Sequence, residues 1–222
     1  MADEKNAAEI VMLPEGRLIN HSLFTRDIYT NPQGQQGAAL YKAEIAWPKG
    51  TLDLISNKML DFANAKWGAG AEDDVILPIK DGDVMAKARA KDGKDGDAYA
   101  GQEVLRMNTK YNKFGDDGPG GISVFGPDGE TEIGVVNSSE VYQGCYVIAG
   151  VTFSGYQVED ARTKTKLNAI TLYLVAVQKT NDGERLVAQI DRSKLFKPVG
   201  RPPVEEGEGE GGATPSRNQR KG

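Results

Sequence analysis

The stretch VYQGCYVIAGVTFSGY, residues 141–156, decides the fold. From Cys145 to Tyr156 the odd positions are apolar, whereas the even positions carry most of the polar and aromatic residues. Because side chains alternate between the two faces of a β-strand, this pattern predicts a long strand with one apolar face. The other face carries a tyrosine near each end, Tyr146 and Tyr156.

Further strands are predicted on both sides of this stretch. Residues 40–47, LYKAEIAW, alternate in the same way, with their apolar residues at the odd positions. Residues 102–111 and 169–179 are predicted as strands as well. The triplet Asn-Asp-Gly at 181–183 predicts a turn into a last strand at 185–190.

One helix is predicted, in the segment TLDLISNKMLDFANAKWG at 51–68. Its apolar residues recur near helical spacing, with Thr51 as the candidate cap and Gly68 as the stop. Residues 80–101 are rich in Gly, Asp and Lys and are predicted as a loop or a pair of short elements. Turn signals dominate residues 112–140, which are predicted to be mostly loop.

One helix among five or more strands, joined by long connections, is typical of a small β-barrel and not of an alternating βαβ fold. We therefore predict a mainly β fold: a five-stranded oligonucleotide-binding (OB) barrel with one main helix and long loop insertions. A β-sandwich fits the same pattern nearly as well. The barrel domain is expected at residues 10–197, between a flexible N-terminus at 1–9 and a disordered Glu/Gly/Pro-rich tail at 198–222.

Composition and charge exclude several classes of protein. Of 222 residues, 27 are Lys or Arg and 32 are Asp or Glu, so the net charge is −5. This charge argues against coating of duplex DNA by bulk positive charge and leaves room for a local basic groove. No apolar run is long enough for a transmembrane helix, and the N-terminus lacks a secretory signal, so a cytoplasmic protein without a membrane partner is expected.

Little in the sequence supports catalysis. His21 is the only histidine, and the single cysteine, Cys145, excludes an internal disulfide and a multi-cysteine zinc site. Cys145 lies on the apolar face of its strand, as a small buried hydrophobe does. The run DGKDGD at 92–97 lacks the ligand pattern of a full calcium loop, and GPGG at 118–121 lacks the Lys-Ser/Thr of a phosphate-binding loop. We predict no catalytic residue, no metal and no cofactor.

Basic and aromatic residues indicate a binding surface instead. Arg106, Asn108 and Lys110 alternate on one face of their strand, and Tyr111 ends it. Positive charge holds phosphates, and aromatic rings stack on nucleic-acid bases with little sequence preference. The candidate contact residues, which include a basic loop at 162–166, are Lys42, Arg106, Asn108, Lys110, Tyr111, Tyr146, Tyr156, Arg162, Lys164 and Lys166. A solvated strand face and tyrosines that cap the core are the alternative interpretations.

Five segments of the chain resemble, in this order, the single-stranded DNA-binding proteins of tailed phages of enterobacteria, a family long catalogued as a domain of unknown function. They are GRLINHSLF (16–24), YKAEIAWPKG (41–50), AYAGQEVLRMNTK (98–110), VYQGCYVIAGVTFSGY (141–156) and LNAITLYLVAVQKTNDGERL (167–186). The resemblance implies an OB fold and non-catalytic, sequence-tolerant binding of single-stranded DNA. It also implies a role in phage DNA replication or recombination in the host cytoplasm.

In the resembled family, a flexible acidic C-terminal tail contacts phage or host replication proteins and competes with DNA. Here Glu205, Glu206, Glu208 and Glu210 supply an acidic run, but basic residues follow them and no aromatic residue ends the tail. Two alternatives to DNA binding stay open on the sequence. One is a capsid or tail protein of a phage, built on a β-barrel without a basic and aromatic groove, and the other is a nuclease with clustered carboxylates.

Overall fold

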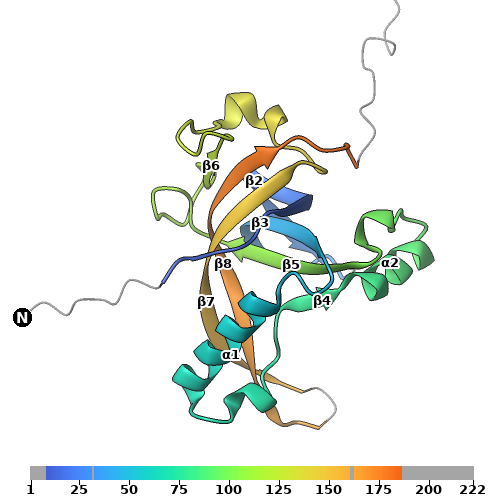
Figure 1. The fold of residues 1–222 in the computed structure, drawn as a ribbon, viewed down its shortest axis with the longest axis vertical. Helices are drawn as coiled ribbons and strands as arrows, with labels where there is room; N and C mark the ends of the chain where they lie inside the picture. The colour runs from blue at the N-terminus through green and yellow to red at the C-terminus, as the bar shows by residue number, and fades with distance from the viewer. Residues whose placement is uncertain (1–8, 32, 161–162, 187–222) are drawn as a thin grey trace, which may run out of the picture. The chain divides into compact units, whose positions relative to one another are not determined.

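Figure 1 shows the fold of the computed structural model, which describes residues 9–31, 33–160 and 163–186. The chain divides into two units, and the second, Gln189–Gly222, lies outside these residues, as does almost all of the predicted flexible N-terminus. The predicted tail at 198–222 therefore stays a prediction. The described elements are β1 (Val11–Met12), β2 (Gly16–Thr30), β3 (Gln36–Pro48), α1 (Asp53–Trp67), η1 (Ala71–Asp73), β4 (Ile79–Asp81), α2 (Gly82–Lys91), η2 (Asp97–Tyr99), β5 (Gln102–Thr109), β6 (Ser123–Phe125), η3 (Val135–Glu140), β7 (Tyr146–Glu159) and β8 (Lys166–Asn181).

Five of these strands close a barrel. β7 pairs with β2, β2 with β3, and β3 with β5, all antiparallel. β5 then pairs with β8 in parallel, and β8 returns antiparallel to β7, so the pairings form a ring. A five-stranded ring of this kind agrees with the predicted OB barrel. β1, β4 and β6 pair with single members of the ring and extend it.

The barrel interior is filled by every second residue of its strands. In β3 the side chains that the alternation predicted to be buried, Tyr41, Ala43, Ile45 and Trp47, are all buried. Glu44 and Ala46 on the opposite face are buried as well, because Ala46 belongs to a second core on the outside of the barrel and Glu44 pairs with Arg106. Trp47 also donates a hydrogen bond from its indole nitrogen to the Pro14 carbonyl oxygen (3.1 Å). Gly16 lies against the Trp47 ring, where any side chain would clash, so this position of β2 requires a glycine.

Helix α1 packs against the barrel through the apolar side chains that the sequence placed on one face. Ile55, Met59 and Ala63 are buried, and Phe62 meets Phe153 of β7 edge to face, with 5.9 Å between the ring centroids. This packing covers one side of the β7–β8 hairpin.

The start of α1 differs from the prediction. The helix begins at Asp53, and the Thr51 hydroxyl donates to the Pro48 carbonyl oxygen (2.7 Å) instead of capping the helix. The Glu103 carboxylate of β5 accepts a hydrogen bond from the Leu52 N–H (2.6 Å), so a residue distant in sequence caps this end. The predicted Thr51 cap is therefore wrong.

Residues 80–101 contain a second α-helix that the sequence analysis did not single out. α2 follows β4 directly, and the Asp81 carboxylate caps it by accepting from the Asp83 N–H (2.8 Å). Residues of this region cover a small second core on the outside of the barrel, made of Ile19, Ala46, Tyr99 and Val104.

The predicted last strand at 185–190 is wrong for its described part. β8 extends to Asn181, and residues 182–186 form no strand. The Leu186 N–H donates instead to the Gln143 carbonyl oxygen (3.0 Å), which ties this segment to the start of β7. Residues 187–190 lie outside the described part of the chain.

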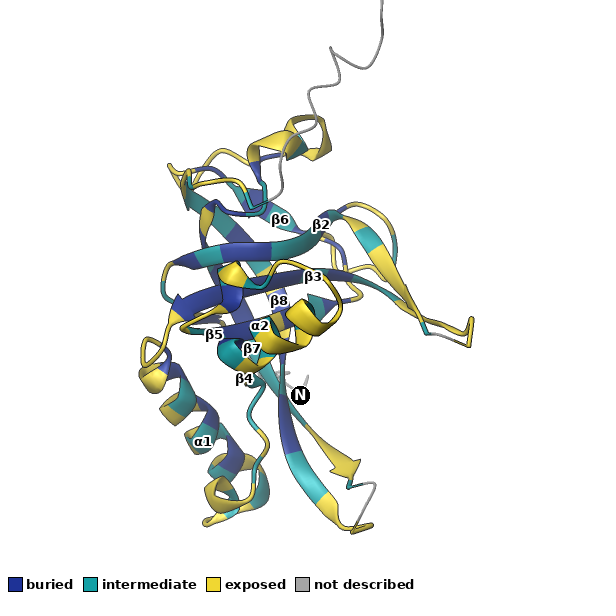
Figure 2. Cartoon of the chain, turned by 90° about the vertical axis from the view of Figure 1, so that its right-hand side faces the viewer, coloured by how far each residue is buried: buried dark blue, intermediate teal, exposed yellow. Residues whose placement is uncertain are grey.

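Two hairpins extend away from the barrel. Figure 2 shows buried residues following the barrel strands, whereas the ends of the β2–β3 and β7–β8 hairpins are exposed. Within the described ranges, no helix is both long enough and apolar enough to span a membrane.

Candidate nucleic-acid interface

A row of side chains crosses the outer face of the barrel. Lys42 of β3 lies opposite Asn108 of β5, Asn108 lies beside Tyr173 of β8, and Tyr173 lies opposite Thr152 of β7. Paired residues of neighbouring strands project to the same face, so these side chains form one cross-strand row. With strands about 4.8 Å apart, the row is about 14 Å long. Two of its four members, Lys42 and Asn108, were predicted as contact residues.

Two exposed aromatic rings, one in this row and one beside it, line a common hollow. Tyr173 is 46% exposed and Tyr111 is 48% exposed, although both residues are large and apolar enough to be buried. Both line a hollow of about 510 Å³, together with Phe125 and the hydroxyl-bearing Thr109 and Thr152. The hollow, called the aromatic hollow below, offers ring faces and a few polar groups, as a site for an unstacked base requires.

Cations flank the row, and each of them is held by a carboxylate. Arg106 pairs with Glu44 at 3.0 Å, and Glu44 is only 3% exposed. Lys42 pairs with Asp27 of β2, which lowers the pKa of that carboxyl group. The pair of Lys42 and Asp27 is exposed, and exposed ion pairs contribute little to stability, so a phosphate oxygen can replace Asp27 as the partner of Lys42.

Lys110 lies where the charged and the aromatic parts of the surface meet. Its ammonium nitrogen is 3.3 Å from the Asp117 carboxylate and 4.9 Å from the centre of the Tyr111 ring. The hydrogen bond to Asp117 raises the pKa of Lys110. Lys113 repeats this combination, 5.4 Å from the Phe114 ring and 2.8 Å from the Glu132 carboxylate.

The structure separates the two tyrosines of β7. Tyr156 projects to the same side as Thr152 and lies four residues further along the strand, so it extends the row. Tyr146 lies ten residues from Tyr156, or about 33 Å along the strand, and pairs with Arg17 and Asn181 at the other end of β7. The two rings therefore cannot form one stacking platform.

The predicted basic loop lies at the end of the β7–β8 hairpin. Lys166 opens β8 opposite Glu159, and Lys164 pairs with Glu159 at 3.4 Å. Lys164 also has a positive φ of 60°, as residues in tight turns do. Arg162 lies outside the described residues.

The predicted contact residues left out Tyr173, Thr152, Phe125, Lys113 and Phe114 of this surface. Tyr173 follows the buried Leu172 in a strand, so its alternation could have placed it on the outer face. Phe114, which is 72% exposed, stands in a loop and carries no periodic signal.

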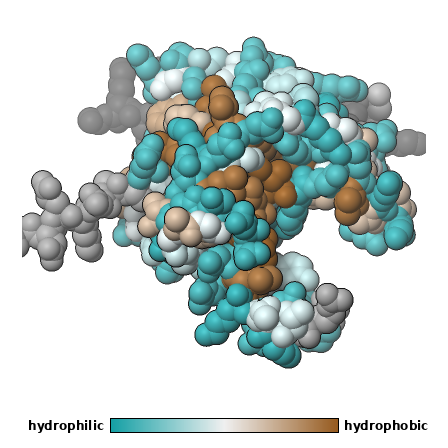
Figure 3. All heavy atoms as spheres, turned by 60° about the horizontal axis from the view of Figure 1, so that its bottom comes forward, coloured by the Kyte–Doolittle hydropathy of each residue, from teal (hydrophilic) through white to brown (hydrophobic). Residues whose placement is uncertain are grey.

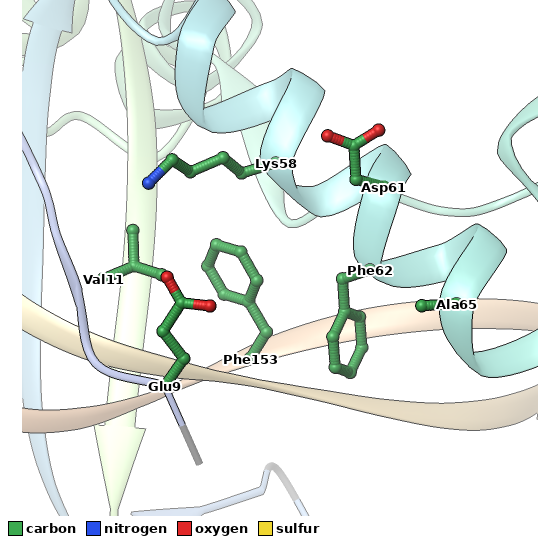
Figure 4. A pocket seen from close by; sticks show the side chains of 7 residues that line it. All are labelled: Glu9, Val11, Lys58, Asp61, Phe62, Ala65 and Phe153. Atoms are coloured by element: carbon green, nitrogen blue, oxygen red, sulfur yellow. The ribbon is translucent and has the colours of Figure 1, made fainter.

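A second pocket lies on the other side of the β7–β8 hairpin, against α1. Its volume is about 420 Å³, and Phe62 and Phe153 are among its lining residues. Figure 4 shows Lys58 and Asp61 on the helix above these rings, and Glu9 near the start of the described chain. Because its one amine is accompanied by two carboxylates, this α1 pocket is a poor place for a phosphate.

Figure 3, which brings the lower part of Figure 1 forward, shows where apolar residues reach the surface on this face. Apolar residues form a band across the middle of this face, between hydrophilic residues.

The remaining candidate groups do not form a reactive site in the described part of the chain. Cys145 is fully buried, and burial raises the pKa of its thiol, which disfavours the nucleophilic thiolate. Burial lowers the pKa of His21, whose Nδ1 has no hydrogen-bond partner among the described residues. No cluster of three or more His, Cys, Asp or Glu suited to a metal occurs in the described ranges.

Several solved structures share the fold of this chain. The single-stranded DNA-binding protein from bacteriophage Enc34, in a C-terminally truncated form, has a TM-score of 0.53 and 20% identity over 80% of this chain and 88% of its own. The Enc34 protein in complex with ssDNA has a TM-score of 0.53 and 18% identity over 80% and 89%. gp2.5, a single-stranded DNA binding protein encoded by bacteriophage T7, has a TM-score of 0.53 and 12% identity over 88% and 98%. At these identities the likeness establishes the fold.

Comparison of the sequence establishes the family. No curated protein matches the chain. The model of the family described as "Enterobacter phage Enc34, ssDNA-binding protein" matches residues 27–207, which include the barrel from the last residues of β2 onward. The chain therefore belongs to the Enterobacter phage Enc34 ssDNA-binding protein family.

Proposed function

We propose that this chain is a phage single-stranded DNA-binding protein that acts by binding alone, with little sequence preference. The cross-strand row with the aromatic hollow beside it is the observation that carries the proposal. It combines exposed rings, an amide and cations on one face of an OB barrel, which is the combination that single strands require. Membership of the Enc34 family and the ssDNA complex of the Enc34 protein support it.

In the proposed complex, bases stack on the rings and phosphates follow the cations. Tyr173 and Tyr111 offer faces to successive bases, and Asn108 lies between them and Lys42, where it reaches a base edge or a sugar. Lys42 and Lys110 exchange their exposed carboxylate partners for phosphates, whereas the half-exposed Arg106 keeps the buried Glu44 and offers its remaining N–H groups to a phosphate. Tyr156 and the lysines of the β7–β8 hairpin extend this surface beyond the barrel.

The same surface favours single strands over a duplex. The bases of a duplex are stacked on one another and cannot enter the aromatic hollow. A duplex would have to bind through its phosphates alone, and a chain with a net charge of −5 offers little bulk attraction for them. Protection of exposed single strands during phage DNA replication or recombination in the host cytoplasm is the role that this preference suits.

Fluorescence anisotropy with labelled oligo-dT and a duplex of equal length tests the proposal. We expect tight binding of oligo-dT, weak binding of the duplex and no cleavage of either when magnesium is present. Equal affinity for the two, or no binding of oligo-dT, would contradict the proposal. Cleavage of the DNA would point to the nuclease alternative.

A further inference from the structure

Two cations from distant parts of the chain converge on one carboxylate beside the aromatic hollow. The Arg26 guanidinium of β2 lies 2.8 Å from one oxygen of Asp117, and the Lys110 ammonium lies 3.3 Å from the other. Arg26 is the less exposed partner, with 24% of its side chain accessible, whereas Lys110 and Asp117 are about half exposed. The local charge of the three groups is therefore +1, and an anion bridges the two cations.

The loop that carries Asp117 is held in place by buried groups and not by these ion pairs alone. The side chain of Asn112 accepts hydrogen bonds from the Phe114 N–H (2.8 Å) and the Asp116 N–H (3.1 Å), and donates to the Pro119 carbonyl oxygen (2.9 Å). The fully buried Tyr41 donates its hydroxyl proton to the Gly118 carbonyl oxygen (2.8 Å). Removal of the Asp117 charge should therefore leave the loop and both cations where they are.

Lys110 connects this cluster to the aromatic surface. It touches the Tyr111 ring as well as Asp117, and it lies two residues beyond Asn108 on the same side of the chain. A phosphate in the position of the Asp117 carboxylate would thus be next to a base on Tyr111. An arginine and a lysine around one anion are a common arrangement for phosphate recognition.

We infer that Arg26 and Lys110 form a subsite for one DNA phosphate, and that Asp117 occupies this subsite in the free protein. Arg26 is thereby a DNA-binding residue that no sequence pattern singled out. Asp117 competes with the phosphate and weakens binding. The inference rests on the proposed function, because it needs a single strand on the adjoining row.

The experiment compares Asp117→Asn with Asp116→Asn in the full chain. Both variants remove one negative charge from the same loop, but the Asp116 carboxylate makes no ion pair within the described residues. We expect Asp117→Asn to bind oligo-dT about two- to fivefold more tightly at low salt, the range that loss of an exposed ion pair gives. Asp116→Asn should change affinity clearly less, and Arg26→Gln should weaken binding.

A second comparison keeps the inference separate from general charge effects and from the proposed function. In an Arg26→Gln/Lys110→Gln background, the further change Asp117→Asn should give no gain in affinity. The subsite is refuted if the gain persists in that background, or if Asp116→Asn gives the same gain. Thermal melts by circular dichroism check that all variants are folded. If the parent protein does not bind oligo-dT at all, the proposed function fails first.

Discussion

The two faces of the β7–β8 hairpin come from the same alternating residues and differ in what covers them. On one face, Phe153 packs against Phe62, and Gly155 lies so close to the Trp67 ring that an added side-chain carbon would be 2.5 Å from it. On the other face, Thr152 and Tyr173 lie side by side and nothing in the described chain buries the tyrosine ring. Burial of a large apolar side chain stabilises a fold by about 1.5–3 kcal/mol. The barrel leaves this ring exposed beside the aromatic hollow, where a base can stack on it in the proposed complex.

The largest effect is expected from a substitution on the face that α1 covers. Phe153→Ala removes the edge-to-face contact with Phe62 and opens a space under α1, and we expect it to lower the free energy of unfolding by about 2–4 kcal/mol. Phe153→Leu should recover much of this loss. Chemical denaturation measures the loss, and affinity for oligo-dT, measured where the variant is folded, should stay within about twofold. A large loss of affinity in the folded variant would mean that DNA also uses the covered face.

The next largest effect is expected from a substitution on the open face, and it concerns the affinity for DNA. Tyr173→Ala should weaken binding of oligo-dT by about 1–3 kcal/mol, the value of one lost base stack, with little change in thermal stability. Tyr146→Ala is the matched control, because this tyrosine is also exposed but lies at the far end of β7. Anisotropy titrations of the two variants decide the comparison. Equal losses would show that the row does not define the platform.

A smaller effect tests the charges beside the open face. Arg106→Gln alone would leave the buried Glu44 carboxylate unpaired, so the clean variant is Arg106→Gln/Glu44→Gln. We expect log K for oligo-dT to fall linearly with log salt, and this variant to flatten the slope by about 0.7, the value of one phosphate contact on a single strand. Lys58→Gln, beside the α1 pocket, should leave the slope unchanged. A slope that both variants alter equally would contradict a local groove.

The smallest expected effect is the pH dependence of stability, which comes from His21 inside the barrel that both faces belong to. Burial holds the pKa of His21 below the ordinary value of a histidine, so the folded protein keeps this side chain neutral. As the pH falls below about 6.5, the unfolded chain takes up the proton first, and the stability that depends on the neutral form is progressively lost. The melting temperature should therefore fall between about pH 7 and pH 5.5 in the parent protein and less so in His21→Gln. An identical pH dependence in the variant would assign the effect to other groups.

Local alternation explains why much of the barrel could be predicted from the sequence. The alternation at 40–47 gave both the strand and its buried face, since period 2 is a property of the strand itself. The long β2 was not predicted as one strand, because its pairing with β3 shifts register between Ser22 and Asp27 and this breaks the pattern. α2 was not predicted because its sequence, GDVMAKARAK, has mostly alanines for apolar residues and buries only Gly82, so it carries no strong apolar stripe.

The candidate site was less accessible to prediction because it is assembled by pairing between distant strands. Asn108 and Lys110 were found from spacing within one strand, but Tyr173 joins them only through the β5–β8 pairing. Tyr146 and Tyr156 share a face by alternation, and only the length of β7 shows how far apart they are. The convergence of Arg26 and Lys110 on Asp117 depends on a loop conformation that no local pattern encodes.

The single parallel pairing that closes the barrel has a consequence for its motions. β5 and β8 are joined in register at one residue pair, Asn108 and Tyr173, whereas β7 and β8 pair along the whole hairpin. This seam has the fewest paired residues in the ring, one against two between β2 and β7, and transient opening there should speed amide hydrogen exchange along it. A strand of DNA that contacts both Asn108 and Tyr173 would connect β5 and β8 across this seam and hold the two strands together. Bound DNA should then slow exchange along β5 and β8 beyond the residues that it contacts, because binding to the closed form alone lowers the population of the open one.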